Sequence, residues 1–172
     1  MNYFEFYNLP VSFKINNAEL KKKYFEFSKL YHPDFFTNAK STEIENALEK
    51  STLNTNAFKV LSSLNSRMKY ILELKEIIHA DEKFKLPNDF LLEMMDLNEA
   101  IDELQFEQDA KKKEVVISEI KAFENQLQQS VQHLIDKENV DEFSPIDFEK
   151  IKEYYFKKKY LNRLEEQITK VE

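Results

Sequence analysis

The sequence predicts an all-α protein made of two helical domains. The composition is 42% hydrophobic and 33% charged, with four prolines and no glycine, which favours helices over disordered or all-β chains. Apolar residues recur at helical spacing through most of the chain. The polar, proline-containing segment 79–89 lacks this periodicity, so we place a boundary there, between a domain of residues 1–79 and a domain of residues 80–172.

The first domain is expected to contain four helices, over residues 2–8, 18–31, 41–62 and 66–78. Asn16 or Asn17 caps the second of them, which is basic. One face of this basic helix is apolar and consists of Leu20, Tyr24, Phe27 and Tyr31. The third helix is expected to pack antiparallel on that face through Ile44, Ala47, Leu48, Leu53, Ala57, Phe58, Val60, Leu61 and Leu64.

The basic helix ends in the tripeptide His32-Pro33-Asp34. Proline pushes the residue before it out of the α region, so His32 and Asp34 emerge from the helix at the tip of a helical hairpin. The sequence then reads as a loop over residues 34–41. Four lysines lie mostly outside the apolar face: Lys21, Lys22, Lys23 and Lys29. A histidine and a carboxylate are thereby displayed at the end of a positive helix, although a bare tripeptide of this kind also fits an ordinary proline-terminated helix.

The second domain is expected to be an antiparallel bundle of three helices, over residues 89–106, 110–137 and 144–171. Residues 88–109 carry eight acids and neither lysine nor arginine. The apolar residues of this helix cover more of its circumference than one core stripe requires. Leu91, Leu92 and Met95 would then lie exposed beside acids, as in a protein-binding surface. The alternative is a wide buried face with a solvated acidic side.

Composition excludes several kinds of site. Without cysteine the chain can form no disulfide, thiolate metal site or cysteine nucleophile. Without glycine it has neither a P-loop nor a dinucleotide-binding fingerprint. Glu76 and His79 match half of a di-iron carboxylate site, but Ser130 stands at that spacing before His133, so the second half is missing. We therefore expect no metal, no cofactor and no catalytic residue.

Charge and hydropathy indicate protein partners. The net charge of −7 and the lack of groove-reading residues in the basic helix argue against nucleic acid. No apolar run approaches the roughly 18 residues of a membrane span, and the first residues do not resemble a signal peptide. We expect a cytoplasmic protein that binds neither membrane nor nucleic acid.

The order of short helix, basic helix, His-Pro-Asp and closing helix resembles the J domain of DnaJ-type co-chaperones. Together with the segment FLLEMMDLNEAIDEL and the ending KKKYLNRLEEQI, it resembles the HscB family of co-chaperones for iron–sulfur cluster assembly over nearly the whole chain. The resemblance implies an L-shaped protein with an N-terminal J domain and a C-terminal three-helix bundle of the oligomerisation type. We expect a monomer or a weak dimer.

By this resemblance the chain is a co-chaperone and not an enzyme. His32, Pro33 and Asp34 would trigger ATP hydrolysis in a DnaK- or HscA-type chaperone, docked through Lys21, Lys22, Lys23 and Lys29. The bundle would bind and deliver an IscU-type scaffold through Leu91, Leu92, Met95, Asp96, Glu99, Glu103 and Tyr160. A J-domain adaptor for a different client is the alternative, which scaffold binding would distinguish. Phe35 departs from the family, which usually has lysine there.

Overall fold

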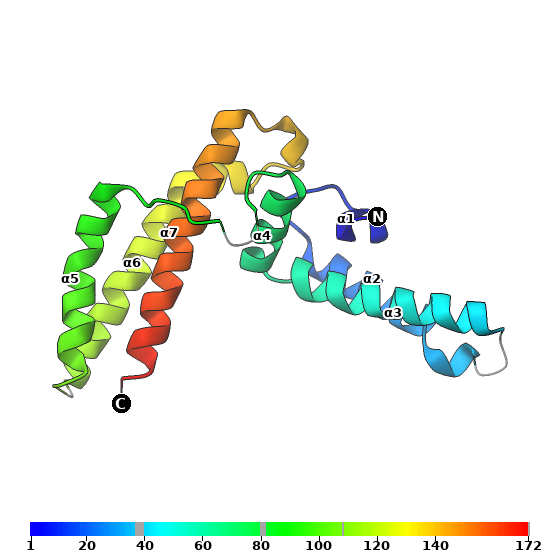
Figure 1. The fold of residues 1–172 in the computed structure, drawn as a ribbon, viewed down its shortest axis with the longest axis horizontal. Coiled ribbons are helices and arrows are strands. Elements are labelled where there is room, and N and C mark those ends of the chain that lie inside the picture. The colour runs from blue at the N-terminus through cyan, green and yellow to red at the C-terminus, as the bar shows by residue number, and fades with distance from the viewer. Residues whose placement is uncertain (37–39, 80–81, 108, 172) are drawn as a thin grey trace. The chain divides into compact units, whose positions relative to one another are not determined.

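The computed structural model describes residues 1–36, 40–79, 82–107 and 109–171 (Figure 1). Within these residues every regular element is a helix, as the composition predicts. The chain forms two compact units, Met1–Leu74 with Ile135–Glu142, and Lys75–Leu134 with Phe143–Glu172. The boundary expected at residue 80 falls on residues 80–81, which lie outside the described residues. The first unit ends before that point and also includes a segment that we had assigned to the second domain.

The first unit contains α1 (Tyr3–Phe6), α2 (Asn17–Leu30), the 3-10 turn η1 (Pro33–Phe36), α3 (Ser41–Leu61) and α4 (Leu64–Leu74). Asn16 caps α2, because its side-chain oxygen accepts hydrogen bonds from the N–H groups of Ala18 and Glu19 at 3.0 and 3.3 Å. α3 packs against α1, α2, α4 and η1, so it is the central helix of the unit.

The apolar face of α2 packs as predicted. Leu20 is buried, and the ring of Tyr24 stacks on that of Phe58 with centroids 4.4 Å apart. Phe27 makes ring contacts with Phe6 and Tyr7, which belong to or follow α1. The four-residue helix α1 is therefore held by aromatic packing, since a helix of this length is not stable alone.

The prediction for two apolar residues of α3 is wrong, because Ile44 and Leu48 are exposed. The buried positions of α3 are Ala47, Asn54, Ala57 and Leu61. Leu48 follows Ala47 by one residue and so points about 100° away from it around the helix. Ile44 lies in the first turn of α3, before Ala47, which is the first buried residue of this helix.

Two buried polar side chains, which the sequence did not reveal, fix this unit. Asn54 accepts a hydrogen bond from the Tyr7 hydroxyl at 2.7 Å and donates to the carbonyl of Tyr24 at 3.1 Å, so it links α3 to α2 and to the residue after α1. Arg67 donates to the carbonyl of Phe13 at 2.7 and 2.9 Å and also to that of Leu61. Burial lowers the pKa of Arg67, and these carbonyls replace the water that its guanidinium loses.

The connection after α6 packs on the first unit. The N–H of Val140 donates to the carbonyl of Val11 at 2.9 Å, and the Ser12 hydroxyl donates to the carbonyl of Lys137 at 3.0 Å. Val140 itself is buried in the 3-10 turn η2 (Val140–Glu142). A loop expected to belong to the bundle is therefore part of the other core.

The second unit contains α5 (Asn88–Leu104), α6 (Ala110–Ile135) and α7 (Pro145–Thr169), which lie side by side in Figure 1. Its core consists of Phe90, Met94, Leu97, Ile101, Leu104, Val116, Ile120, Leu161, Leu164 and Ile168. Burying each such side chain contributes roughly 1.5–3 kcal/mol relative to exposure. Ser144 caps α7 by accepting a hydrogen bond from the N–H of Asp147 at 3.2 Å.

The segment before α5 runs along α7, although its sequence reads as a plain linker. Glu82 and Lys152 form an ion pair of 2.6 Å, and the rings of Phe84 and Phe156 stack at 4.6 Å and 4°. Leu86 packs against the core of the unit. Because Lys152 and Phe156 are one helical turn apart, the alternate residues Glu82 and Phe84 of the segment follow a single face of α7.

Candidate functional site

The tripeptide His32-Pro33-Asp34 lies at the end of the hairpin formed by α2 and α3. Helix α2 ends when the N–H of Tyr31 bonds to the carbonyl of Phe27 at 2.9 Å. The chain then turns into η1, which begins at Pro33, so the residues after the tripeptide form a 3-10 turn where we expected a loop. All three residues of the tripeptide are exposed, and residues 37–39 of the expected loop lie outside the described residues.

His32 and Asp34 interact within this turn. The N–H of Asp34 donates to Nδ1 of His32 at 3.3 Å, and Oδ2 of Asp34 lies 3.6 Å from the same nitrogen. The Asp34 side chain remains 84% exposed and can accept a bidentate hydrogen bond from a guanidinium of another protein.

The four lysines proposed to dock the chaperone differ in their surroundings. Lys21, Lys22 and Lys29 are exposed, whereas the side chain of Lys23 is 25% exposed. Lys22 and Lys23 pair with the acids Glu26 and Glu19 of the same helix at 4.0 and 3.9 Å. These pairs are long and solvated, so they compete weakly with an acidic partner. Glu19 and Glu26 thus partly offset the positive charge that the sequence predicts for this helix.

Phe35 directly follows the tripeptide and is 75% exposed. Its ring contacts that of His32 edge to face, with centroids 6.1 Å apart. An open hollow of about 450 Å³ beside it is lined by Tyr31, Phe36 and Ala47, among others. The tripeptide therefore has an aromatic neighbour in place of a cation.

Helix α5 presents two different faces. Phe90, Met94, Leu97, Ile101 and Leu104 are buried, at the spacing of one core stripe. Leu91, Leu92 and Met95 are 37%, 65% and 52% exposed. The predicted exposure of these three side chains is confirmed, and their role in binding stays a prediction.

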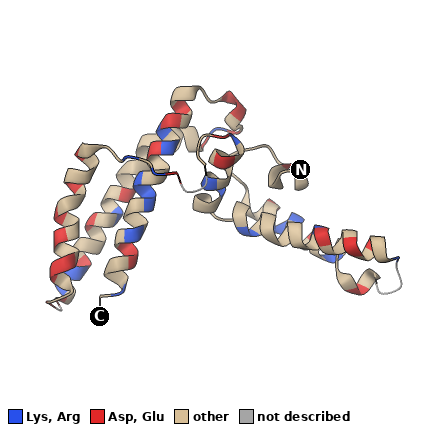
Figure 2. Cartoon of the chain, viewed as in Figure 1, with Lys and Arg blue, Asp and Glu red and all other residues tan. Residues whose placement is uncertain are grey.

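Acids surround the exposed apolar residues of α5. Asp96, Glu99 and Glu103 are exposed, and no blue residue interrupts the red positions of α5 in Figure 2. Glu103 bonds to the ammonium of Lys112 on α6, a hydrogen bond that raises the pKa of Lys112. Asp96 and Glu99 are thus the predicted acids more open to a basic partner.

Tyr160 lies beside this face and is half-buried. Its ring meets that of Phe90 edge to face at 5.7 Å, and its hydroxyl accepts a hydrogen bond from Asn98 at 2.9 Å. The guanidinium of Arg163 stands 5.0 Å from the centre of the ring. Asn98 and Arg163 are not among the predicted site residues, although their spacing of three residues from Met95 and Tyr160 could have indicated them.

The described residues show no group of three or more histidine, aspartate or glutamate side chains arranged to hold a metal ion. In that same part of the chain, no helix has the length and hydropathy to cross a bilayer. The features that remain are an exposed tripeptide at a hairpin tip and an acidic-apolar helix face. They define a J-domain protein with a helical C-terminal domain.

Comparisons with known proteins agree with this class. Residues 86–169 match the family described as the HSCB C-terminal oligomerisation domain. The human iron-sulfur cluster co-chaperone protein HscB is 30% identical over 168 residues, which cover 97% of this chain and 67% of the human protein. The mouse protein of the same name is 32% identical over the same extent.

Solved structures give the same result. The crystal structure of human HscB superimposes with a TM-score of 0.80 at 29% identity, over 98% of this chain and 81% of the other. The chaperone HscB from Vibrio cholerae has a TM-score of 0.71 at 22% identity, over the full length of both chains, which supports the fold alone. The chain belongs to the HscB family of co-chaperones of iron–sulfur cluster assembly.

Proposed function

We propose that this co-chaperone stimulates the ATPase of a DnaK- or HscA-type chaperone and delivers an IscU-type scaffold to it. The observation that carries the proposal is the presence of two separate exposed sites in one chain. One is the tripeptide of the first unit, and the other is the acidic-apolar face of α5 in the second. The protein supplies no catalytic group and shifts a conformational equilibrium of the chaperone.

The proposed interaction with the chaperone depends on Asp34 and on the lysines of α2. Asp34 pairs with an arginine of the chaperone and so disturbs contacts that hold its ATP-bound state. Lys21, Lys22, Lys23 and Lys29 attract an acidic surface and speed the encounter. His32 supports the turn, because its Nδ1 accepts the hydrogen bond from the N–H of Asp34.

The proposed interaction with the scaffold depends on the surface around Leu92. Leu91, Leu92 and Met95 bury apolar area against the scaffold and supply most of the affinity. Asp96, Glu99, Glu103 and Tyr160 surround them and orient the partner. A partner with apolar side chains inside a basic rim would match this surface.

The proposed stimulation of the chaperone is tested by steady-state ATP hydrolysis by the DnaK-type chaperone with wild-type protein, His32→Gln and Asp34→Asn. Both side chains are exposed, so we expect both variants to keep the wild-type melting temperature. Asp34→Asn removes the charge that pairs with arginine, and we expect it to abolish the stimulation. Full stimulation by Asp34→Asn would refute the role of the tripeptide.

A further inference from the structure

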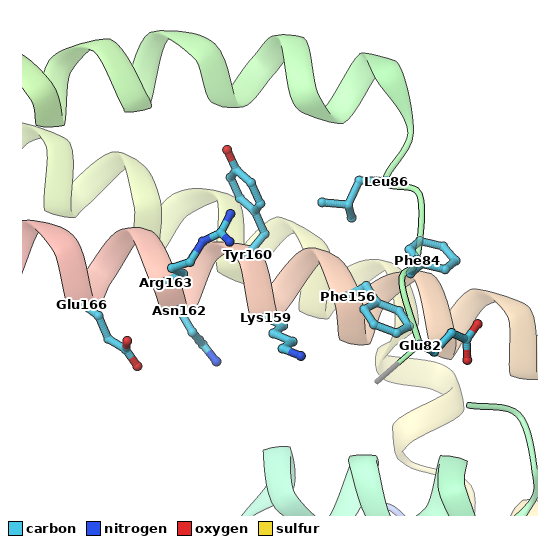
Figure 3. A pocket seen from close by; sticks show the side chains of 9 residues that line it. All are labelled: Glu82, Phe84, Leu86, Phe156, Lys159, Tyr160, Asn162, Arg163 and Glu166. Carbon is cyan, nitrogen blue, oxygen red and sulfur yellow. The ribbon is translucent and has the colours of Figure 1, made fainter. Parts of the chain in front are cut away.

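An open groove lies along α7, next to the segment that precedes α5 (Figure 3). Its volume is about 510 Å³. One end is mostly apolar and contains the stacked rings of Phe84 and Phe156 together with Leu86 and Tyr160. The carboxylate of Glu82 also lines this end. The other end is polar and contains Lys159, Asn162, Arg163 and Glu166.

The polar end offers two cations to a ligand. Lys159 and Arg163 are exposed, and among the described residues neither has an ion-pair partner. Lys152 and Lys157, on the same helix, are already paired with Glu82 and Glu153 at 2.6 Å each. Two acids also line the groove, Glu82 and Glu166, but Glu82 is neutralised by Lys152, so Glu166 is left against the two positive charges. The groove therefore favours an acidic ligand, in contrast to α5, which carries six acids and no base.

Tyr160 connects this groove to the face of α5. It lines the groove, while its ring contacts Phe90 and its hydroxyl binds Asn98, both on α5. Asn98 follows Met95 by three residues, so it borders the exposed apolar patch. A protein that covers Met95 and Tyr160 must also reach the mouth of the groove.

We propose that the scaffold that binds α5 also places an acidic segment in this groove. An aliphatic or aromatic side chain of the segment packs against Phe84, Phe156 and Leu86. Its carboxylates pair with Lys159 and Arg163. The partner thus meets an acidic patch and a basic groove side by side, and this alternation of charge fixes the direction in which it binds. This inference rests on the proposed scaffold binding and extends the site onto α7.

The experiment is a calorimetric titration of purified IscU-type scaffold into the full chain at low and high salt. The variants are Lys159→Glu and Arg163→Glu, with Arg163→Lys as the charge-conserving variant. Lys150→Glu is the matched control, because Lys150 is also an exposed lysine of α7 but lies about 180° around the helix from Lys159. Leu92→Ala reports on the α5 face separately.

We expect each charge reversal in the groove to weaken scaffold binding about tenfold at low salt and less at high salt, because solvent ions screen the pairs. Arg163→Lys and Lys150→Glu should bind within about twofold of the wild type. If Leu92→Ala weakens binding but the groove variants match Lys150→Glu, the groove is not part of the site and this inference fails alone. If the wild type does not bind scaffold at all, this inference and the proposed scaffold binding fail together.

Discussion

The double substitution of Leu92 and Met95 by alanine tests quantitatively whether the scaffold binds to this face of α5. Each change removes about three heavy atoms, worth about 0.8 kcal/mol apiece when a partner buries them fully. Leu92 is 65% exposed and Met95 is 52% exposed in the free protein, so these fractions are what a partner can still bury. The losses are then about 1.6 and 1.2 kcal/mol, and together they correspond to roughly a 100-fold weaker complex.

The assay is calorimetric titration with an IscU-type scaffold, with thermal unfolding measured in parallel. Both side chains lie outside the core, so the melting temperature should change by less than about 3 °C. Ile146→Ala is the control, because Ile146 is an apolar side chain of α7 that is 67% exposed. It lies about four helical turns from Tyr160, the residue of α7 that borders the proposed scaffold surface. Binding by the double variant within about twofold of the wild type would refute the assignment of this face.

Three further predictions concern stability, measured by urea unfolding. Asn54→Ala should cost about 2–3 kcal/mol because it removes the buried link between α2 and α3, and a loss below 0.5 kcal/mol would contradict that role. Burial raises the pKa of Tyr154 from 10.0 to about 12, so stability should fall between pH 10 and pH 12 as the phenol ionises in the unfolded state first. Tyr154→Phe should reduce this fall and add about 1 kcal/mol at pH 7, since the buried hydroxyl has no acceptor among the described residues; an unchanged pH profile would contradict this. Glu76→Gly should stabilise the protein by about 0.5–1 kcal/mol, because Glu76 has a φ of 57°, in the left-handed region that glycine adopts without strain. Asn8→Gly should stabilise it less, because asparagine tolerates a positive φ such as the 50° of Asn8, and a larger gain from Asn8→Gly would contradict this explanation.

The helices could be predicted because their signals are local. Periodic apolar residues place α2, α3 and α7 to within a few residues, and the caps Asn16 and Ser144 mark two of the starts. The exposed patch of α5 could be predicted for a related reason. A helix with more apolar residues than one stripe can bury must expose some of them, and Leu92 and Met95 are among those exposed.

The remaining features depend on contacts between distant segments. The stack of Phe84 on Phe156 joins residues 72 positions apart, so no local pattern reveals that the linker lies on α7. The packing of Val140 near Val11 has the same cause. Asn54 illustrates a different limit, because an asparagine inside an amphipathic helix usually faces water. Its burial is explained by its hydrogen-bond partners Tyr7, Tyr24 and Ser28, which no local pattern reveals.

The most direct test of the account is steady-state ATP hydrolysis by the DnaK-type chaperone under four conditions: chaperone alone, with this protein, with scaffold, and with both. The account predicts stimulation by this protein and a larger, more than additive stimulation when scaffold is present, because one chain then engages both partners. Stimulation that scaffold does not increase would contradict the delivery of scaffold, and no stimulation under any condition would contradict the account as a whole.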